Sequence, residues 1–347
     1  MIFLLGGKRG RHFSLPSVFF LGLFLFGVYV SAETVTFDGR TSNLNVPASY
    51  ASGTPAPLIV LLHGYGSNGI SADLYFRLSN ISEEFGFFLL NPDGLVDGNN
   101  PGWNATDACC DFNPPAHDDS SFLRGLIEAV INQYNIDPRM IFITGHSNGG
   151  FMSYRMACDH ADIVAAIASL AGATFNDPES CNPSEPVHVL QIHGTNDSII
   201  NYAGGVIGAV TYPSAIGSVE RWNAYNNCTN SQDASVPLRD IDDRVVGDET
   251  STIRFTDGCA LGGSGELWTI VSGTHVPKIW LDDDYARNLV EYFFSHTKPE
   301  TFSVPALSFM PTSFLGLMFF LATIYYRRRP FKKDPFNGEG GKCPPFP

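Results

Sequence analysis

The sequence predicts an α/β fold, in which a mostly parallel central sheet carries helices on both faces. Short, continuously apolar runs such as residues 57–62 and 140–144 alternate with longer amphipathic stretches. Continuous apolar runs are typical of strands buried on both faces, and their alternation with helices is typical of parallel sheets. In addition, no linker and no internal repeat divides residues 33–300. We therefore expect this region to be a single domain.

The first half of this domain follows the alternation in order. The strand at 57–62 precedes a helix over about 71–84 and a second buried strand at 87–90. Residues 97–118 are rich in Gly, Asn, Asp and Pro, a composition that predicts a loop. A helix over about 120–134 then leads to the strand at 140–144 already named.

The second half continues the pattern. After a helix that ends near Cys158, the apolar residues 163–170 and 187–192 predict two more strands. A later strand includes Ile270, and a final helix is expected over 283–295. Because the connection between the strands at 163–170 and 187–192 is short, no large cap domain is expected.

Both ends of the chain carry targeting signals. Basic residues precede an apolar run at 18–30 that ends in small residues, which predicts a signal peptide over residues 1–32. An uncleaved signal anchor is the alternative. Residues 304–326 are long and apolar enough to span a bilayer. The tail, residues 327–347, begins with a basic cluster, which predicts a cytoplasmic tail and a domain outside the cytoplasm.

The C-terminal segment has two interpretations. A plain stop-transfer helix is one. The other is a bacterial sorting signal, because Val304-Pro305-Ala306-Leu307 before an apolar span and an Arg cluster resembles such signals. The expected localisation is therefore export, with the domain secreted or tethered to the cell envelope.

Charge and cysteine content restrict the class of partner. The formal net charge of −14 disfavours nucleic acid, because an acidic surface repels phosphates. Of the seven cysteines, Cys343 falls in the predicted cytoplasmic tail, and the other six predict disulfides in an exported domain. Cys228 with Cys259 is the favoured single pair. No metal is expected, since no CxxC pair or His spacing supports a zinc site.

The motif that carries chemistry is Gly145-His146-Ser147-Asn148-Gly149, which fits G-x-S-x-G. In this motif the Ser stands on a sharp turn between a strand and a helix at the carboxyl edge of a sheet. Here the motif follows a predicted strand and opens a predicted helix. We therefore predict that Ser147 is a catalytic nucleophile, rather than a structural Ser in a glycine-rich turn.

A serine hydroxyl needs a base and an acid to orient that base. His275 lies in a loop between the last predicted strand and the last helix, where such a base is expected. Asp197 lies in the loop after the strand at 187–192 and is the favoured acid. Asp177 and Asp257 are the alternatives, although both resemble turn residues.

Two backbone amides must hold the oxyanion of the reaction. The residue after the nucleophile, Asn148, supplies one, and Tyr65, in the loop after the strand at 57–62, is predicted to supply the other. Trp103, Phe151 and Tyr65 are predicted aromatic walls of a substrate site, with burial in the core as the alternative for Trp103 and Phe151.

Four segments of the sequence resemble the corresponding segments of a known protein family. PLIVLLHGYGSNG begins at Pro57, Trp103-Asn104 precedes Cys109-Cys110, GHSNGGFMSYRMAC begins at Gly145 and VHVLQIHGTNDSIINYAGG begins at Val187. Together they resemble secreted feruloyl esterases and polyhydroxybutyrate depolymerases over about residues 38–295. The resemblance implies an α/β-hydrolase with Ser147, Asp197 and His275 as its triad. The family's Gly-Gly-His-Thr-Trp-Pro is Gly273-Thr274-His275-Val276-Pro277 here. The Trp that would line the site is absent, so the resemblance supports the assignment of His275 more strongly than the identity of the substrate.

These observations predict an exported serine esterase without a cofactor or metal. Its expected partners are a polymeric or oligomeric ester, either a polyhydroxyalkanoate or a feruloyl or acetyl polysaccharide ester, and the membrane through residues 304–326. A serine peptidase or acyltransferase on the same fold is the alternative enzyme. A non-catalytic surface binding protein is the alternative from another class.

Overall fold

The computed structural model describes residues 31–110, 112–113, 116–229 and 231–300. Most of the predicted signal peptide, the apolar span 304–326 and the tail 327–347 lie outside these residues. Among the helices that the structure describes, none is both long and apolar enough to cross a membrane.

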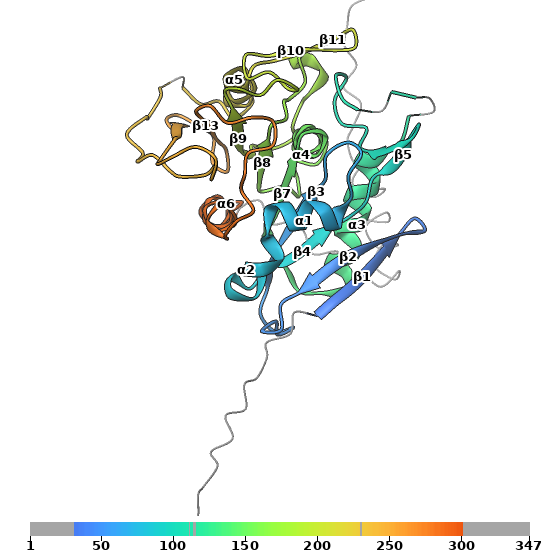
Figure 1. Ribbon diagram of the computed structural model, residues 1–347. Helices are drawn as coiled ribbons and strands as arrows, with labels where there is room; N and C mark the ends of the chain where they lie inside the picture. The colour runs from blue at the N-terminus through green and yellow to red at the C-terminus, as the bar shows by residue number, and fades with distance from the viewer. Residues whose placement is uncertain (1–30, 111, 114–115, 230, 301–347) are drawn as a thin grey trace, which may run out of the picture. The chain divides into compact units, whose positions relative to one another are not determined.

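Within these residues the main sheet has nine strands in the order β1-β2-β4-β3-β7-β8-β9-β13-β12 (Figure 1). The six central strands from β4 to β13 run parallel. The remaining pairings, β1 with β2, β2 with β4 and β12 with β13, are antiparallel. The predicted mostly parallel sheet is therefore confirmed, and antiparallel strands close both of its edges.

The strands of the main sheet have the following bounds: β1 Ser31–Phe37, β2 Arg40–Val46, β3 Ala56–Leu62, β4 Phe88–Asn91, β7 Ile136–His146, β8 Ala166–Leu170, β9 His188–Gly194, β12 Thr250–Phe255 and β13 Ser264–Ile270. Two small hairpins stand apart from it: β5 Leu95–Asp97 with β6 Asn100–Gly102, and β10 Gly205–Ile207 with β11 Val210–Tyr212. The hairpin of β5 and β6 lies at the start of the predicted loop 97–118.

The helices are α1 Gly69–Phe76, α2 Leu78–Phe85, α3 Asp119–Gln133, α4 Asn148–Asp159, α5 Ala215–Tyr225 and α6 Asp284–Ser295, with a short 3₁₀ helix at Pro178–Ser180. They cover both faces of the sheet, as adjacent residues of β13 illustrate. Trp268 belongs to the core cluster that contains residues of α1, α2 and α6, whereas Leu267 packs with α5. On the α5 side, the ring of Trp222 lies 6.2 Å from that of Tyr154 on α4.

The single helix predicted over 71–84 is in fact two helices. Arg77 separates α1 from α2 and adopts a left-handed conformation with φ 59°. Its Nε atom lies 2.8 Å from the Asp283 carboxylate, just before α6. This ion pair with a distant residue lies at the break between the two helices. No Gly or Pro near Arg77 marks the break in the sequence.

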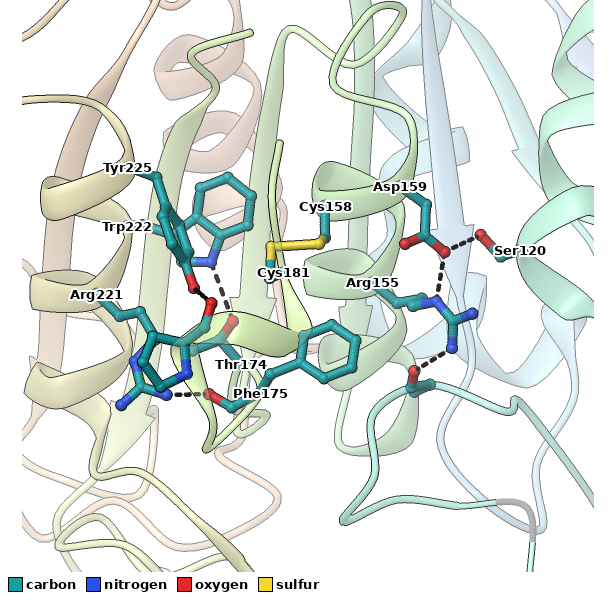
Figure 2. Close-up of a disulfide and its surroundings, with 12 residues drawn as sticks. Ser120, Arg155, Cys158, Asp159, Thr174, Phe175, Cys181, Arg221, Trp222 and Tyr225 are labelled. Carbon is teal, nitrogen blue, oxygen red and sulfur yellow. Dashed lines mark hydrogen bonds and ion pairs between the residues drawn. A yellow bond between two sulfur atoms is a disulfide. The ribbon is translucent and has the colours of Figure 1, made fainter. Parts of the chain in front are cut away.

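Three disulfides lie within the described part of the chain: Cys109–Cys110, Cys158–Cys181 and Cys228–Cys259. The predicted pair of Cys228 with Cys259 is confirmed. Figure 2 shows how Cys158, at the end of α4, is bonded to Cys181 in the segment that follows β8. Next to it, Trp222 on α5 donates from Nε1 to Thr174 Oγ1 at 3.1 Å, so the disulfide and this hydrogen bond tie one segment to two helices.

Candidate active site

Ser147 stands on the turn between β7 and α4, at the carboxyl edge of the sheet. Its backbone angles are φ 55° and ψ −118°, a combination that residues other than glycine rarely adopt. Its N–H donates to Leu170 O of β8 at 2.8 Å, which holds the turn against the neighbouring strand. Contacts with the surrounding structure hold the backbone in this strained conformation, as is common at reactive residues.

Glycines of the motif permit this turn because neighbouring backbone comes very close. A Cβ on Gly149 would lie 2.1 Å from Leu62 O, and one on Gly145 would lie 2.5 Å from Gly149 C. No larger residue fits at either position without moving β3 or α4. The spacing of the motif therefore reflects the packing of a strand, a turn and a helix.

The three residues predicted as the triad lie in one hydrogen-bonded chain. Ser147 Oγ lies 3.0 Å from His275 Nε2, and His275 Nδ1 lies 2.8 Å from Asp197 Oδ2. Asp197 follows β9 and His275 follows β13, and these strands are parallel neighbours in the sheet. Their carboxyl ends therefore bring together residues that are far apart in the sequence.

Asp197 is buried and is held as a carboxylate by its neighbours. Its Oδ1 accepts hydrogen bonds from the amides of Ile199 and Ile200, at 2.8 and 2.9 Å. His193 Nε2 lies 3.2 Å from Oδ2. Burial acts to raise the pKa of Asp197, but hydrogen bonds from His193, His275 and the Ile199 amide outweigh burial and hold this pKa below its usual value. No motif in the sequence marked His193 as a partner of Asp197.

The loop that carries His275 is fastened by side chains from other parts of the chain. His146 donates from Nε2 to His275 O at 2.7 Å, and Tyr75 on α1 donates to Pro277 O at 2.9 Å. The His146 ring also lies 4.8 Å from that of His275. These contacts come from the elbow and from α1, so they connect the base directly to the region of the nucleophile.

A second fastening comes from the segment between α5 and β12. Asp242 is buried and accepts from the Lys278 amide at 2.9 Å and from Arg244 Nε at 3.1 Å. Arg244 Nη2 in turn donates to Thr274 Oγ1 at 3.0 Å and to Val276 O. No motif in the sequence marked Asp242 or Arg244, because their role depends on tertiary contacts with residues that follow about thirty positions later in the sequence.

A cavity of about 350 Å³ opens beside Ser147 and His275. Its remaining lining residues come from the loop after β3, from α1, from the elbow and from the base loop: Gly64, Tyr65, Ser67, Ser71, Ala72, Tyr75, Phe76, His146 and Val276. The wall is thus partly polar and partly aromatic. Its volume is in the range of small-molecule sites, and it can admit the reacting part of a larger ester.

Of the two residues predicted to supply oxyanion amides, Asn148 begins α4 and Tyr65 lines the cavity. The first amides of a helix have no intrahelical acceptor, which suits Asn148 to this task. Its buried side chain accepts from Trp103 N at 2.8 Å and donates to Trp103 O at 2.9 Å. Asn148 therefore also anchors the loop that contains Trp103.

The prediction that Trp103 and Phe151 form walls of the substrate site is wrong in this structure. Both side chains are fully buried, and neither lines the cavity. Trp103 donates from Nε1 to His63 O at 3.0 Å, and the ring of Phe151 packs against that of Tyr212, with 6.1 Å between the ring centres. The aromatic residues that do line the cavity are Tyr65, Tyr75 and Phe76. Two of these lie on α1, where the pattern of residues predicted only a helix.

His63, in the loop after β3, braces that loop. It is buried, its Nδ1 donates to Gly64 O at 2.8 Å, and its Nε2 accepts from Gly94 N at 2.9 Å. Among the residues that the structure describes, no group of three His, Cys, Asp or Glu side chains could hold a metal ion.

The model of a protein family described as Phospholipase/Carboxylesterase matches the chain. It covers residues 49–233, which is more than half of the chain and includes Ser147 and Asp197. His275 lies beyond the matched range.

Curated relatives match about half of the chain. Feruloyl esterase C from Emericella nidulans is 31% identical over 183 residues, which cover 51% of this chain and 62% of that protein. Feruloyl esterase B from Piromyces equi is 26% identical over 199 residues, covering 55% of this chain and 36% of that protein. The chain thus spans about half the length of the curated relatives it matches. These matches confirm the predicted resemblance to feruloyl esterases.

A solved structure supports the fold. The acetyl xylan esterase from Aspergillus awamori superposes with a TM-score of 0.56 at 16% identity, covering 76% of this chain and 99% of that chain. At this identity the likeness concerns the fold, which agrees with the parallel sheet and the helices on both faces described above.

Proposed function

The chain belongs to the phospholipase/carboxylesterase family of α/β-hydrolases, and from this premise we propose that it is a serine esterase that hydrolyses carboxylic esters. The observation that carries the proposal is the hydrogen-bonded chain from Ser147 through His275 to Asp197, with lengths of 3.0 and 2.8 Å. A cavity of about 350 Å³ beside Ser147 offers room for the reacting ester.

In the proposed mechanism, Ser147 Oγ attacks the ester carbonyl while His275 Nε2 takes the hydroxyl proton. His275 Nδ1–H donates to Asp197, which keeps the imidazole in the required tautomer and stabilises the imidazolium. The imidazolium then gives its proton to the leaving alcohol, and an acyl-enzyme remains on Ser147. Water, activated by His275, releases the acid and restores the serine hydroxyl.

The amides of Tyr65 and Asn148 are proposed to hold the oxyanion of each tetrahedral intermediate. Asn148 follows the nucleophile directly, and Tyr65 belongs to the loop after β3 that lines the cavity. Donors fixed by the backbone stabilise developing charge without having to reorganise during the reaction.

We further propose an ester of a polymer or oligomer as substrate and a location outside the cytoplasm. The feruloyl esterase relatives and the open cavity support the first. The three disulfides support the second, because disulfides persist in oxidising compartments.

The test is an assay of the purified full chain and of Ser147→Ala on a panel of esters: methyl ferulate, an aryl acetate, an aryl butyrate and hydroxybutyrate oligomers. Hydrolysis by the wild type and not by Ser147→Ala is expected, and the ranking of the esters identifies the acyl class. A folded, oxidised wild type that is inactive on every ester would contradict the proposal. Equal activity of Ser147→Ala would contradict the assigned nucleophile.

A further inference from the structure

His146 occupies the variable position before the nucleophile, and its ring is held in one tautomer. Its Nε2 lies 2.7 Å from His275 O, and since a carbonyl can only accept, Nε2 must carry the proton. The other ring nitrogen, Nδ1, is therefore a hydrogen-bond acceptor. Within the part of the chain that the structure describes, Nδ1 has no hydrogen-bond partner.

The ring also stays neutral over the working range of most esterases. Burial, followed by the nearby His275, lowers the pKa of His146 to about 4. The titratable groups that act on the ring are His275, Asp197 and His193, and the Tyr75 ring lies 5.4 Å from it. Near neutral pH the ring therefore presents a lone pair on Nδ1 and not a positive charge.

This lone pair faces space at the active site. His146 lines the cavity beside Ser147, and so does Gly64. The point that a Cβ on Gly64 would occupy lies 3.4 Å from His146 Nδ1 and 3.6 Å from Ser147 Cβ. Because residue 64 is glycine, no side chain stands at this point to shield Nδ1, and a substrate atom in the cavity that Gly64 and His146 both line can approach it.

The leaving alcohol is the part of the substrate that would meet this acceptor. His275 Nε2 must pass its proton to the alcohol oxygen, so the alcohol lies on the His275 side of Ser147. The His146 ring is on that side, 4.8 Å from the His275 ring. The Tyr75 hydroxyl, which is also nearby, already donates to Pro277 O.

We propose that His146 is a specificity-determining residue whose Nδ1 accepts a hydrogen bond from a hydroxyl group of the leaving alcohol, next to the esterified carbon. This inference rests on the proposed esterase function and makes it more specific. It selects esters of polyols, such as acylated sugars or glycerol, over polyesters, whose internal units carry no free hydroxyl.

The test uses two esters of equal size that differ in one group, the 2-hydroxyethyl ester and the n-propyl ester of the acid that the ester panel ranks first. The readout is the ratio of their kcat/KM values. For the wild type we expect the hydroxyethyl ester to be preferred roughly three- to tenfold, the usual effect of one hydrogen bond between neutral groups.

Three variants separate this role from a structural one. His146→Leu removes the acceptor and should bring the ratio close to one. Gly64→Ala places a methyl group in front of Nδ1 without touching the bond to His275 O, and should also reduce the ratio. His146→Gln offers both an amide donor and a carbonyl acceptor, so it should keep part of the preference. Gly64→Ala keeps the test decisive if His146→Leu does not fold.

A wild-type ratio near one, or a preference unchanged in both His146→Leu and Gly64→Ala, would overturn the inference while leaving the esterase intact. Failure to hydrolyse either ester would instead contradict the proposed function. Acetylated methyl xyloside and monoacetylglycerol, each assayed beside its deoxy analogue, then distinguish an acylated sugar from an acylated glycerol. If neither hydroxylated ester is preferred over its deoxy analogue, the assignment to polyol esters is wrong.

Discussion

The nucleophile and the base of the candidate site are held in place in different ways. Ser147 is fixed by backbone, since its turn is formed by β7 and α4 and its N–H donates to Leu170 O. His275 lies in a loop after β13, which is held by side chains from α1, from the elbow and from the segment between α5 and β12. One position depends on close packing of neighbouring elements and the other on long-range polar contacts.

This difference has a consequence for robustness. Backbone packing tolerates no added volume, so a change at the elbow is expected to affect the stability of the whole domain. Polar contacts to a loop can be broken singly, so a change there is expected to affect the position of His275 more than global stability. Measuring both activity and stability of variants in each region can therefore test whether the elbow and the His275 loop are supported in different ways.

The largest expected effect concerns the acid that orients the base. Asp197→Asn keeps the size of the side chain but replaces the carboxylate that His275 Nδ1–H faces at 2.8 Å. The amide can turn its NH₂ toward the ring and favour the wrong tautomer, so kcat should fall by about 10⁴-fold. Steady-state kinetics on the best ester of the panel measure this. A loss smaller than about tenfold would contradict Asp197 as the acid.

The second effect tests the backbone packing at the elbow. In Gly149→Ala the new methyl group would lie 2.1 Å from Leu62 O, so β3 or α4 must move. The free energy of unfolding should fall by about 3 kcal/mol or more. Gly53→Ala is the matched control, since nothing lies within 4 Å of its Cβ. Equal denaturation midpoints for the two variants would refute the role of close packing.

What the sequence could predict follows the same division. The elbow was predictable because that packing requires a short sequence motif between a strand and a helix, and the positions of Asp197 and His275 followed from the order of strands and loops. The contacts of Asp242 and Arg244 were not predictable, because they depend on where the segment before β12 folds back. Trp103 and Phe151 failed as wall residues for a related reason, since aromatic composition does not reveal which face a side chain takes.

The third effect is a dependence of stability on pH that involves the elbow. The pKa of His146 is lowered from 6.5 to about 4 in the folded protein. The unfolded chain therefore binds a proton below about pH 6.5 that the folded protein does not bind until about pH 4, so stability falls as the pH is lowered through this window. Between pH 6.5 and pH 4.5 the loss should be about 2 kcal/mol for this group.

Denaturant unfolding at pH 7 and pH 4.5 measures this loss, with His146→Gln as the variant that lacks the titrating ring. His188, which lies outside the site and whose pKa is lowered to about 3 by burial, should contribute in the same direction and remain in the variant. If His146→Gln loses as much stability as the wild type over this interval, the ring is not kept neutral by the fold.

The smallest effect tests the fastening of the base loop. Asp242→Asn weakens the contact with Arg244, which reaches Thr274 and Val276, while an acceptor for the Lys278 amide remains. We expect kcat to fall by about tenfold, because a loop that samples other positions places His275 correctly for less of the time.

The position of Ser147 should be unaffected by this change, since Asp242 has no contact with the elbow among its described hydrogen bonds. The denaturation midpoint should therefore change much less than in Gly149→Ala, although kcat changes. This opposite pattern distinguishes the two kinds of support. A large loss of stability with unchanged kcat in the remaining folded protein would show instead that Asp242 supports the fold as a whole, and the contrast between the two regions would no longer hold.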